Sequence, residues 1–133
     1  MDRLDELIQT LVEKNILRGA ALEANTITKA NRLFDQIAKI SRELLQFGDP
    51  AHAKILALLT HENPYVLKWA AFLSLEFNPS KGEQVLEQLA QAYVYRGFAD
   101  PKVLQVGFSS EMTLKQWRRG ELKFVSQWKH RNS

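Results

Sequence analysis

The 133-residue chain is 45% apolar and 25% charged, a composition typical of one globular domain and not of a disordered segment. It contains no cysteine, which excludes disulfides, thiolate metal sites and a cysteine nucleophile, and fits a cytoplasmic protein. No uncharged apolar run reaches the roughly 18 residues that span a bilayer, and the start of the chain lacks the pattern of a secretory signal. We therefore expect a single cytoplasmic domain over residues 1–133 that makes no membrane contact.

Two helices are predicted in the first part of the chain. The first carries apolar residues three and four positions apart, which are Leu4, Leu7, Ile8 and Leu11. The second is longer and runs from Asn25 and Thr26 to Gly48, because glycine favours the left-handed conformation in which many helices end. Its apolar face contains Ile27, Ala30, Phe34, Ile37, Ser41 and Leu44.

Every proline follows an Asn or Asp, in the pairs Asp49-Pro50, Asn63-Pro64, Asn78-Pro79 and Asp100-Pro101. A residue before proline is held in the extended conformation that an N-cap requires, and proline itself is favoured at the first helical position. The first three pairs therefore predict the starts of the third, fourth and fifth helices. A sixth helix is expected from Ser109 or Ser110 to Arg119, closed by Gly120.

No segment shows a convincing strand pattern, so the predicted fold is all-α. Short loops between helices of similar length favour antiparallel neighbours and a short right-handed stack. The fourth helix is apolar on two faces and is expected at the centre of the stack. Tyr65 and Trp69 lie on its second face, where they either complete the core or form an aromatic patch for a partner.

The stretch "HENPYVLKWAAFLSLEFNP" resembles the signature of HEAT repeats, in which a proline-started helix carries a valine and then two alanines that let helices approach closely. Those residues here are Pro64, Val66, Ala70 and Ala71. Over most of its length the chain is similar to a small bacterial family of HEAT-like proteins of unknown function, through "NRLFDQIAKISRELLQFGD" and "GFSSEMTLKQWRRGEL". The resemblance implies a helical-hairpin fold without established catalysis. Some related small helical-repeat proteins are immunity proteins that bind and block a bacterial toxin.

No set of residues points to catalysis, and no metal site or cofactor is predicted. The three histidines, His52, His61 and His130, are not spaced as a ligand pair on a helix, and no known nucleophile or phosphate-loop motif occurs. His61 precedes the Asn63 cap and is expected to bond or pack within that turn.

Asn31, Arg32 and Asp35 form a second polar feature, at the margin of the apolar face of the second helix. An Asn in such a place most often satisfies a backbone group of a loop, since a buried amide left unpaired costs about 1–3 kcal/mol. The alternative is that the three residues form a polar site in a groove.

The net charge of +3 is concentrated in the C-terminal segment, residues 113–133. This segment carries six basic residues against the single acid Glu121, a net charge of +5, so the remaining 112 residues carry −2. Its aromatic residues include Trp117 and Trp128, and the spacing of Phe124, Val125 and Trp128 favours a terminal helix that docks on the stack or on a partner. Basic and aromatic residues together also allow binding of nucleic acid.

The leading hypothesis is a non-enzymatic protein-interaction module, in particular an immunity protein that binds and blocks a cognate toxin. The alternative is a nucleic-acid-binding protein that uses the basic C-terminal segment. Exposed Trp, Tyr and Arg contribute most of the energy of many interfaces. The predicted partner-binding residues are therefore Tyr65, Trp69, Trp117, Arg118, Arg119 and Trp128.

Overall fold

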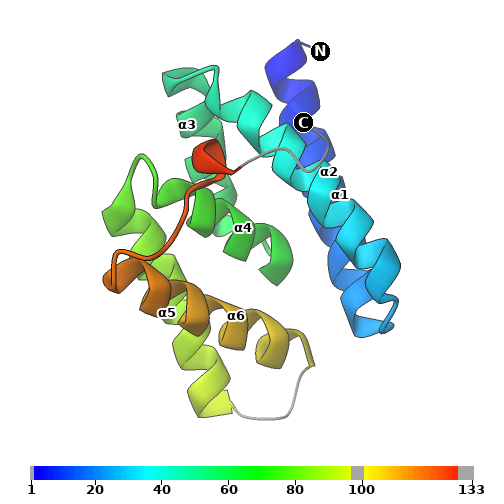
Figure 1. Cartoon of the computed structure of the whole chain (residues 1–133), viewed down its shortest axis with the longest axis vertical. Helices are drawn as coiled ribbons and strands as arrows, with labels where there is room; N and C mark the ends of the chain where they lie inside the picture. Colours follow the sequence, from blue (N-terminus) through cyan, green and yellow to red (C-terminus); the bar gives the residue numbers. More distant parts are fainter. Residues whose placement is uncertain (1, 97–100, 129–133) are drawn as a thin grey trace.

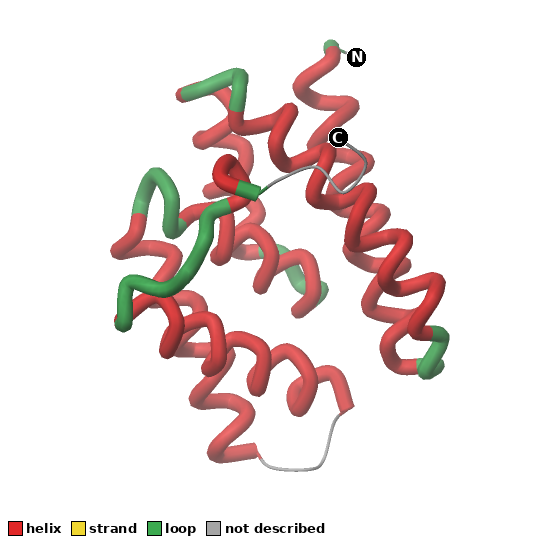
Figure 2. The backbone as a smooth tube through the Cα atoms, in the orientation of Figure 1, coloured by secondary structure: helices red, strands yellow, loops and turns green. Residues whose placement is uncertain are grey.

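The computed structural model describes residues 2–96 and 101–128, which form six α-helices and no strand (Figures 1 and 2). The helices are α1 (Arg3–Glu23), α2 (Ile27–Leu45), α3 (Asp49–Ala57), α4 (Pro64–Ser74), α5 (Pro79–Arg96) and α6 (Pro101–Arg118). Two short 3-10 turns, η1 (Leu58–Thr60) and η2 (Val125–Gln127), complete the secondary structure. The predicted all-α class is confirmed. Within the described ranges, no helix combines the length and the apolar character needed to cross a membrane.

The Asx-Pro pairs mark helix starts, and α4 shows the mechanism most fully. The Oδ1 atom of Asn63 accepts hydrogen bonds from the backbone N–H groups of Tyr65 and Val66, at 2.9 and 3.3 Å. Pro64 occupies the first helical position, where its missing N–H leaves no bond unmade. At α3 the boundary is one residue earlier than predicted, because Asp49 is already helical and Gly48, with φ of 70°, is the N-cap.

The predicted start of the sixth helix at Ser109 or Ser110 is wrong, since α6 begins at Pro101. The residues before Ser109 include β-branched side chains and Gly107, which lower helix propensity and suggested a connection. In the structure, Val106 and Gly107 are buried and α6 packs along α5, so tertiary packing outweighs the local preference.

The helices form two antiparallel pairs with α4 between them (Figure 1). Helices α1 and α2 pack along each other on one side, and α5 and α6 on the other, while α4 contacts α1, α3, α5 and α6. Eight of the eleven residues of α4 are buried, so the prediction that this helix lies at the centre is confirmed. A Cβ atom at Gly82 of α5 would lie 2.7 Å from the carbonyl oxygen of Ala71, so glycine there allows α5 to approach α4 closely.

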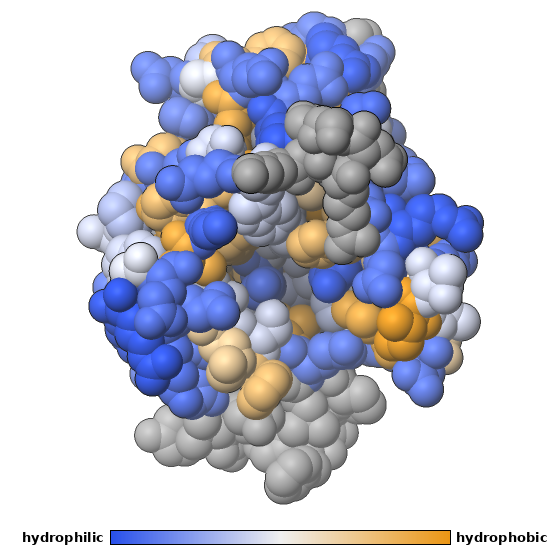
Figure 3. All heavy atoms as spheres, in the orientation of Figure 1, coloured by the Kyte–Doolittle hydropathy of each residue, from blue (hydrophilic) through white to orange (hydrophobic). Residues whose placement is uncertain are grey.

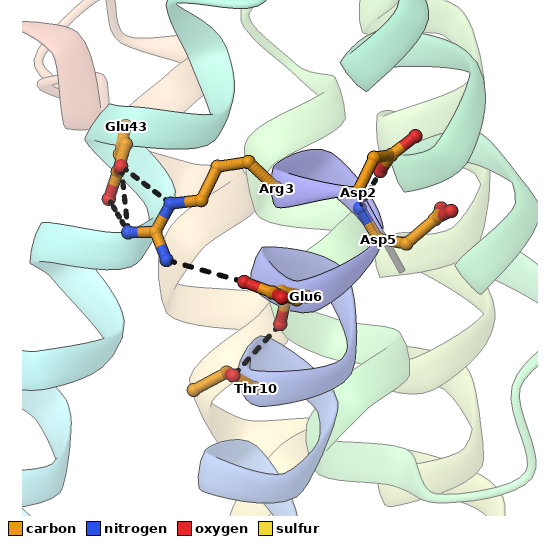
Figure 4. A network of polar contacts seen from close by, with 6 residues as sticks. All are labelled: Asp2, Arg3, Asp5, Glu6, Thr10 and Glu43. Atoms are coloured by element: carbon orange, nitrogen blue, oxygen red, sulfur yellow. Dashed lines mark hydrogen bonds and ion pairs between the residues drawn. The ribbon is translucent and has the colours of Figure 1, made fainter.

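Exposed ionic contacts join the start of α1 to its neighbours (Figure 4). Asp2 caps α1 by accepting the N–H of Asp5 at 2.8 Å, and the Arg3 guanidinium donates to both carboxylate oxygens of Glu43 on α2, at 2.9 and 3.0 Å. The Lys54 ammonium on α3 lies 2.6 Å from the Asp5 carboxylate. This hydrogen bond lowers the pKa of Asp5 and raises the pKa of Lys54.

After α6 the chain turns at Gly120 and returns across α4 to α2 (Figure 1). Val125 is buried in the core, and the Trp128 ring lies 5.7 Å from the rings of both Phe34 and Phe72. The expected docking of this segment is therefore observed, through the turn η2 and not through a helix. The basic residues Lys129 and Arg131 lie outside the described residues.

Candidate anion-binding pocket

The residues predicted to contact a partner do not form one surface. Tyr65 and Trp69 are only 6% and 4% exposed, so they belong to the core and do not form an aromatic patch. Trp117 is half-buried against the cluster that contains Leu114, and Trp128 is half-buried on α2 and α4. None of these four aromatic side chains is therefore fully exposed for contact with a partner.

The two arginines of the predicted set differ in their surroundings. Arg118 forms ion pairs with Glu83 and Glu87 of α5, which neutralise it and link α6 to α5. Arg119 is exposed just beyond the end of α6. The predicted basic surface is thus partly neutralised by the helix beside it.

The predicted polar group on the second helix is not buried. Asn31, Arg32 and Asp35 all lie on the exposed face of α2, so Asn31 does not serve as a buried amide. His61 behaves as predicted, because its Nδ1 atom accepts the backbone N–H of Asn63 at 3.0 Å. The described part of the chain contains no group of three or more His, Asp or Glu side chains that could hold a metal ion.

A pocket of about 260 Å³ lies where α1, α4 and α6 meet, and the face drawn in Figure 3 is hollowed between these helices. Each helix contributes both polar and apolar side chains. The lining residues are Asn15, Arg18 and Leu22 of α1, Tyr65, Lys68 and Trp69 of α4, and Gln105, Val106, Phe108 and Ser109 of α6.

Tyr65 determines how closely the three helices meet. Gly19 lies against its ring, and a Cβ atom at position 19 would be 2.2 Å from the Cδ2 atom of Tyr65. Glycine therefore lets α1 approach α4 at the wall of the pocket. On the other side, the Tyr65 hydroxyl donates to Oε1 of Gln105 at 3.3 Å and links α4 to α6.

Two basic side chains line the pocket, and each lies over an aromatic ring. The Cζ atom of Arg18 is 5.2 Å from the centre of the Phe34 ring, and the Nζ atom of Lys68 is 5.6 Å from the centre of the Phe72 ring. Such cation–π contacts are worth about 0.5–2 kcal/mol and hold the charged groups in place. The rings beneath them are fixed in turn by Trp69, whose Nε1 donates to Ser41 at 2.9 Å.

Neither basic side chain has an acidic partner within the described ranges. The Nε atom of Arg18 is buried and makes no hydrogen bond to the described chain. Burial lowers the pKa of Lys68 to about 8, and the nearby Arg18 charge acts in the same direction. Burial also lowers the pKa of Arg18, which the Tyr65 side chain partly opposes. Two poorly solvated cations in one small pocket form a site that favours a bound anion.

The sequence contained a signal for this pocket that the search for motifs missed. The apolar stripe of α1 through Leu7 and Leu11 continues at helical spacing into the polar residues Asn15 and Arg18. Asn15 is 1% exposed, and its Nδ2 atom donates to the carbonyl oxygen of Leu11. Lys68 is the single charged residue of the apolar helix α4. A titratable residue whose pKa is shifted by burial in a cleft, as for Lys68, is a candidate for function.

Comparison with known proteins places the chain in a family. The model of a family described as a domain of unknown function, DUF2019, matches residues 5–106. The chain belongs to the DUF2019 family. The match spans α1 to α5 and the first part of α6, and so includes Arg18 and Lys68.

One solved structure supports the fold. The chain is similar to the crystal structure of the protein RPA1889 from Rhodopseudomonas palustris CGA009, with a TM-score of 0.76 and 24% sequence identity. The alignment covers 92% of this chain and 98% of the other protein. No match was found among curated proteins.

Proposed function

We propose that this protein is a non-enzymatic, HEAT-like interaction module that binds a partner protein by holding an acidic group of that partner in the pocket of Arg18 and Lys68. The observation that carries the proposal is the presence of these two cations in one pocket, neither of them in an ion pair with a described residue. An anionic group supplied from outside would offset the desolvation of both side chains.

We further propose that the partner is a bacterial toxin in the cytoplasm, blocked because the module covers its active surface. The resemblance to HEAT-like proteins, some of whose relatives are immunity proteins, supports this finer suggestion. Binding of nucleic acid has less support. Arg118, one of its expected contacts, is already neutralised by Glu83 and Glu87.

The test is affinity capture from the lysate of the native host, at low and high salt and after nuclease treatment. We expect one protein at stoichiometric amounts that survives high salt, because salt screens buried ion pairs weakly. The double variant Arg18→Met/Lys68→Met should capture at least tenfold less of it. Lys29→Met removes an exposed lysine of α2 and is the matched control, which should capture the wild-type amount.

Equal capture by the pocket variant and the control would overturn the proposal, as would recovery of nucleic acid alone. The toxin suggestion has its own test. The captured partner, expressed alone, should arrest bacterial growth. Co-expression of the wild-type module should restore growth, and co-expression of the double variant should not.

A further inference from the structure

We infer that the ligand of this pocket is a carboxylate carried on an apolar group the size of one amino-acid residue. The carboxyl terminus of a partner chain that ends in an aliphatic or aromatic residue has this chemistry, and so does a free small acid. The protein source rests on the proposed function, while the ligand chemistry does not.

The volume and the lining of the pocket limit the size of the ligand. Drug-sized ligands occupy roughly 300–1,000 Å³, and this pocket of about 260 Å³ lies below that range. Its lining combines the cations Arg18 and Lys68 with the apolar side chains of Leu22, Trp69 and Val106. A bare inorganic anion would leave the apolar side uncovered, whereas an apolar acid matches both sides.

The donors available in the pocket favour a carboxylate over a phosphate. Phosphate sites commonly use free backbone N–H groups at the start of a helix. The start of α4 lies at the pocket, but Asn63 already accepts the N–H groups of Tyr65 and Val66. The remaining charged donors are the planar guanidinium of Arg18 and the ammonium of Lys68, and a guanidinium pairs with a carboxylate through two parallel hydrogen bonds.

The surface beside the pocket is also apolar, which favours a ligand attached to a protein. Phe108 lines the pocket and is 55% exposed, and Met112, one turn later on α6, is 42% exposed. These side chains extend the apolar surface from the pocket along α6. A chain terminus bound in the pocket would place its preceding residues on this surface, which a free acid could not cover.

The experiment is isothermal titration of the full chain at pH 7 with N-acetylphenylalanine, its uncharged amide and inorganic phosphate. We expect the acid to bind with a dissociation constant on the order of 0.1–1 mM, as for a small ligand of this size. The amide and phosphate should each bind at least tenfold more weakly. Equal binding of the amide, or equal or tighter binding of phosphate, would overturn the inference.

Two variants assign the binding to the pocket. Lys68→Met should weaken binding of the acid about tenfold, the lower part of the range for a charged hydrogen bond. Arg18→Lys keeps the charge and the contact with Phe34 but loses the paired hydrogen bonds, and should also weaken binding about tenfold. Lys29→Met is again the control and should bind normally. Unchanged affinity in both pocket variants would place the acid elsewhere and overturn the inference.

A second titration separates the two sources of the ligand. Acetylated peptides of increasing length that end in phenylalanine should bind at least tenfold more tightly than N-acetylphenylalanine if the natural ligand is a chain terminus. If length adds no affinity, the carboxylate chemistry stands and the chain-terminus source fails, whereas the proposed function is decided by the capture experiment. If a protein is captured through the pocket but the acid does not bind, the proposed function stands and this inference fails.

Discussion

The two ends of α1 use basic residues in opposite ways. At the start of the helix, Arg3 is exposed and pairs with Glu43 of α2 (Figure 4). Lys54 of α3 pairs with Asp5. Near its end, Arg18 lies over an aromatic ring beside Lys68, and neither has an acidic partner in the part of the chain that the structure describes.

The difference separates ionic contacts that join helices from charges that have no ion-pair partner within the described ranges. Exposed ion pairs are worth about 0–1 kcal/mol, since water and salt screen them, and their loss is tolerated. A cation removed from water without a partner destabilises the folded protein. Lys68 and Arg18 are half-buried over aromatic rings, so we expect a smaller penalty of this kind for each of them.

The largest loss of stability is expected when a side chain is added at Gly19, where α1 packs closely against α4. Gly19→Val places side-chain atoms inside the Tyr65 ring, and we expect it to lower the free energy of unfolding by about 3 kcal/mol through overpacking. Ala20→Val changes the exposed neighbouring residue and is the control, with an expected loss of about 0.5 kcal/mol from helix propensity alone. Chemical denaturation measures both variants, and similar losses would refute the close contact.

Two lysine substitutions test the difference between the unpaired and the paired cations, because we expect them to change the free energy of unfolding in opposite directions. Lys68→Met removes a poorly solvated charge and should raise the free energy of unfolding at pH 7 by about 1–2 kcal/mol. Lys54→Met removes an exposed ion pair with Asp5 and should slightly lower it. Denaturation of the two variants at low salt shows the signs. A destabilised Lys68→Met protein would mean that its cation is already satisfied.

The pH dependence of the Lys68→Met gain gives a further check. The pKa of Lys68 is about 8 in the folded chain, and its ordinary value of 10.5 applies to the unfolded chain. Between about pH 8 and pH 10.5 the unfolded chain therefore binds more protons than the folded chain. The stability of the wild-type protein, relative to that of Lys68→Met, should therefore rise over this range and stay constant below it. A constant difference between the two proteins from pH 7 to 10 would contradict the lowered pKa.

The smallest effect is expected at the start of α1. A double-mutant cycle of Arg3→Met and Glu43→Gln should give a coupling energy of about 0.3–1 kcal/mol that falls as salt is added. Equilibrium denaturation at two salt concentrations measures it. A coupling well above this range, or one insensitive to salt, would show that this pair is not the screened contact its exposure indicates.

Several elements of the fold could be predicted because they depend on neighbouring residues. The Asn63-Pro64 pair predicts the start of α4 through steric effects within a few bonds, and the structure confirms that start. The start of α6 was misplaced at Ser109, although the Asp100-Pro101 pair indicates a helix start at Pro101, where α6 begins, by the same local sterics as the other three pairs. Tyr65 and Trp69 were predicted to contact a partner but are buried. An apolar pattern on two faces of a helix does not show how many neighbouring helices will cover those faces.

By itself, the sequence determined the helical class, the main helix starts and the apolar stripe of α1, because these follow from local sterics and from spacing along one helix. The tertiary structure alone decided that Arg18 and Lys68, fifty positions apart, line one pocket with Gln105 of a third helix. It also decided that neither of them forms an ion pair within the described ranges. The physical reason is that charge pairing depends on distances between helices. Those distances are set by contacts such as Gly19 against Tyr65, which no local pattern encodes.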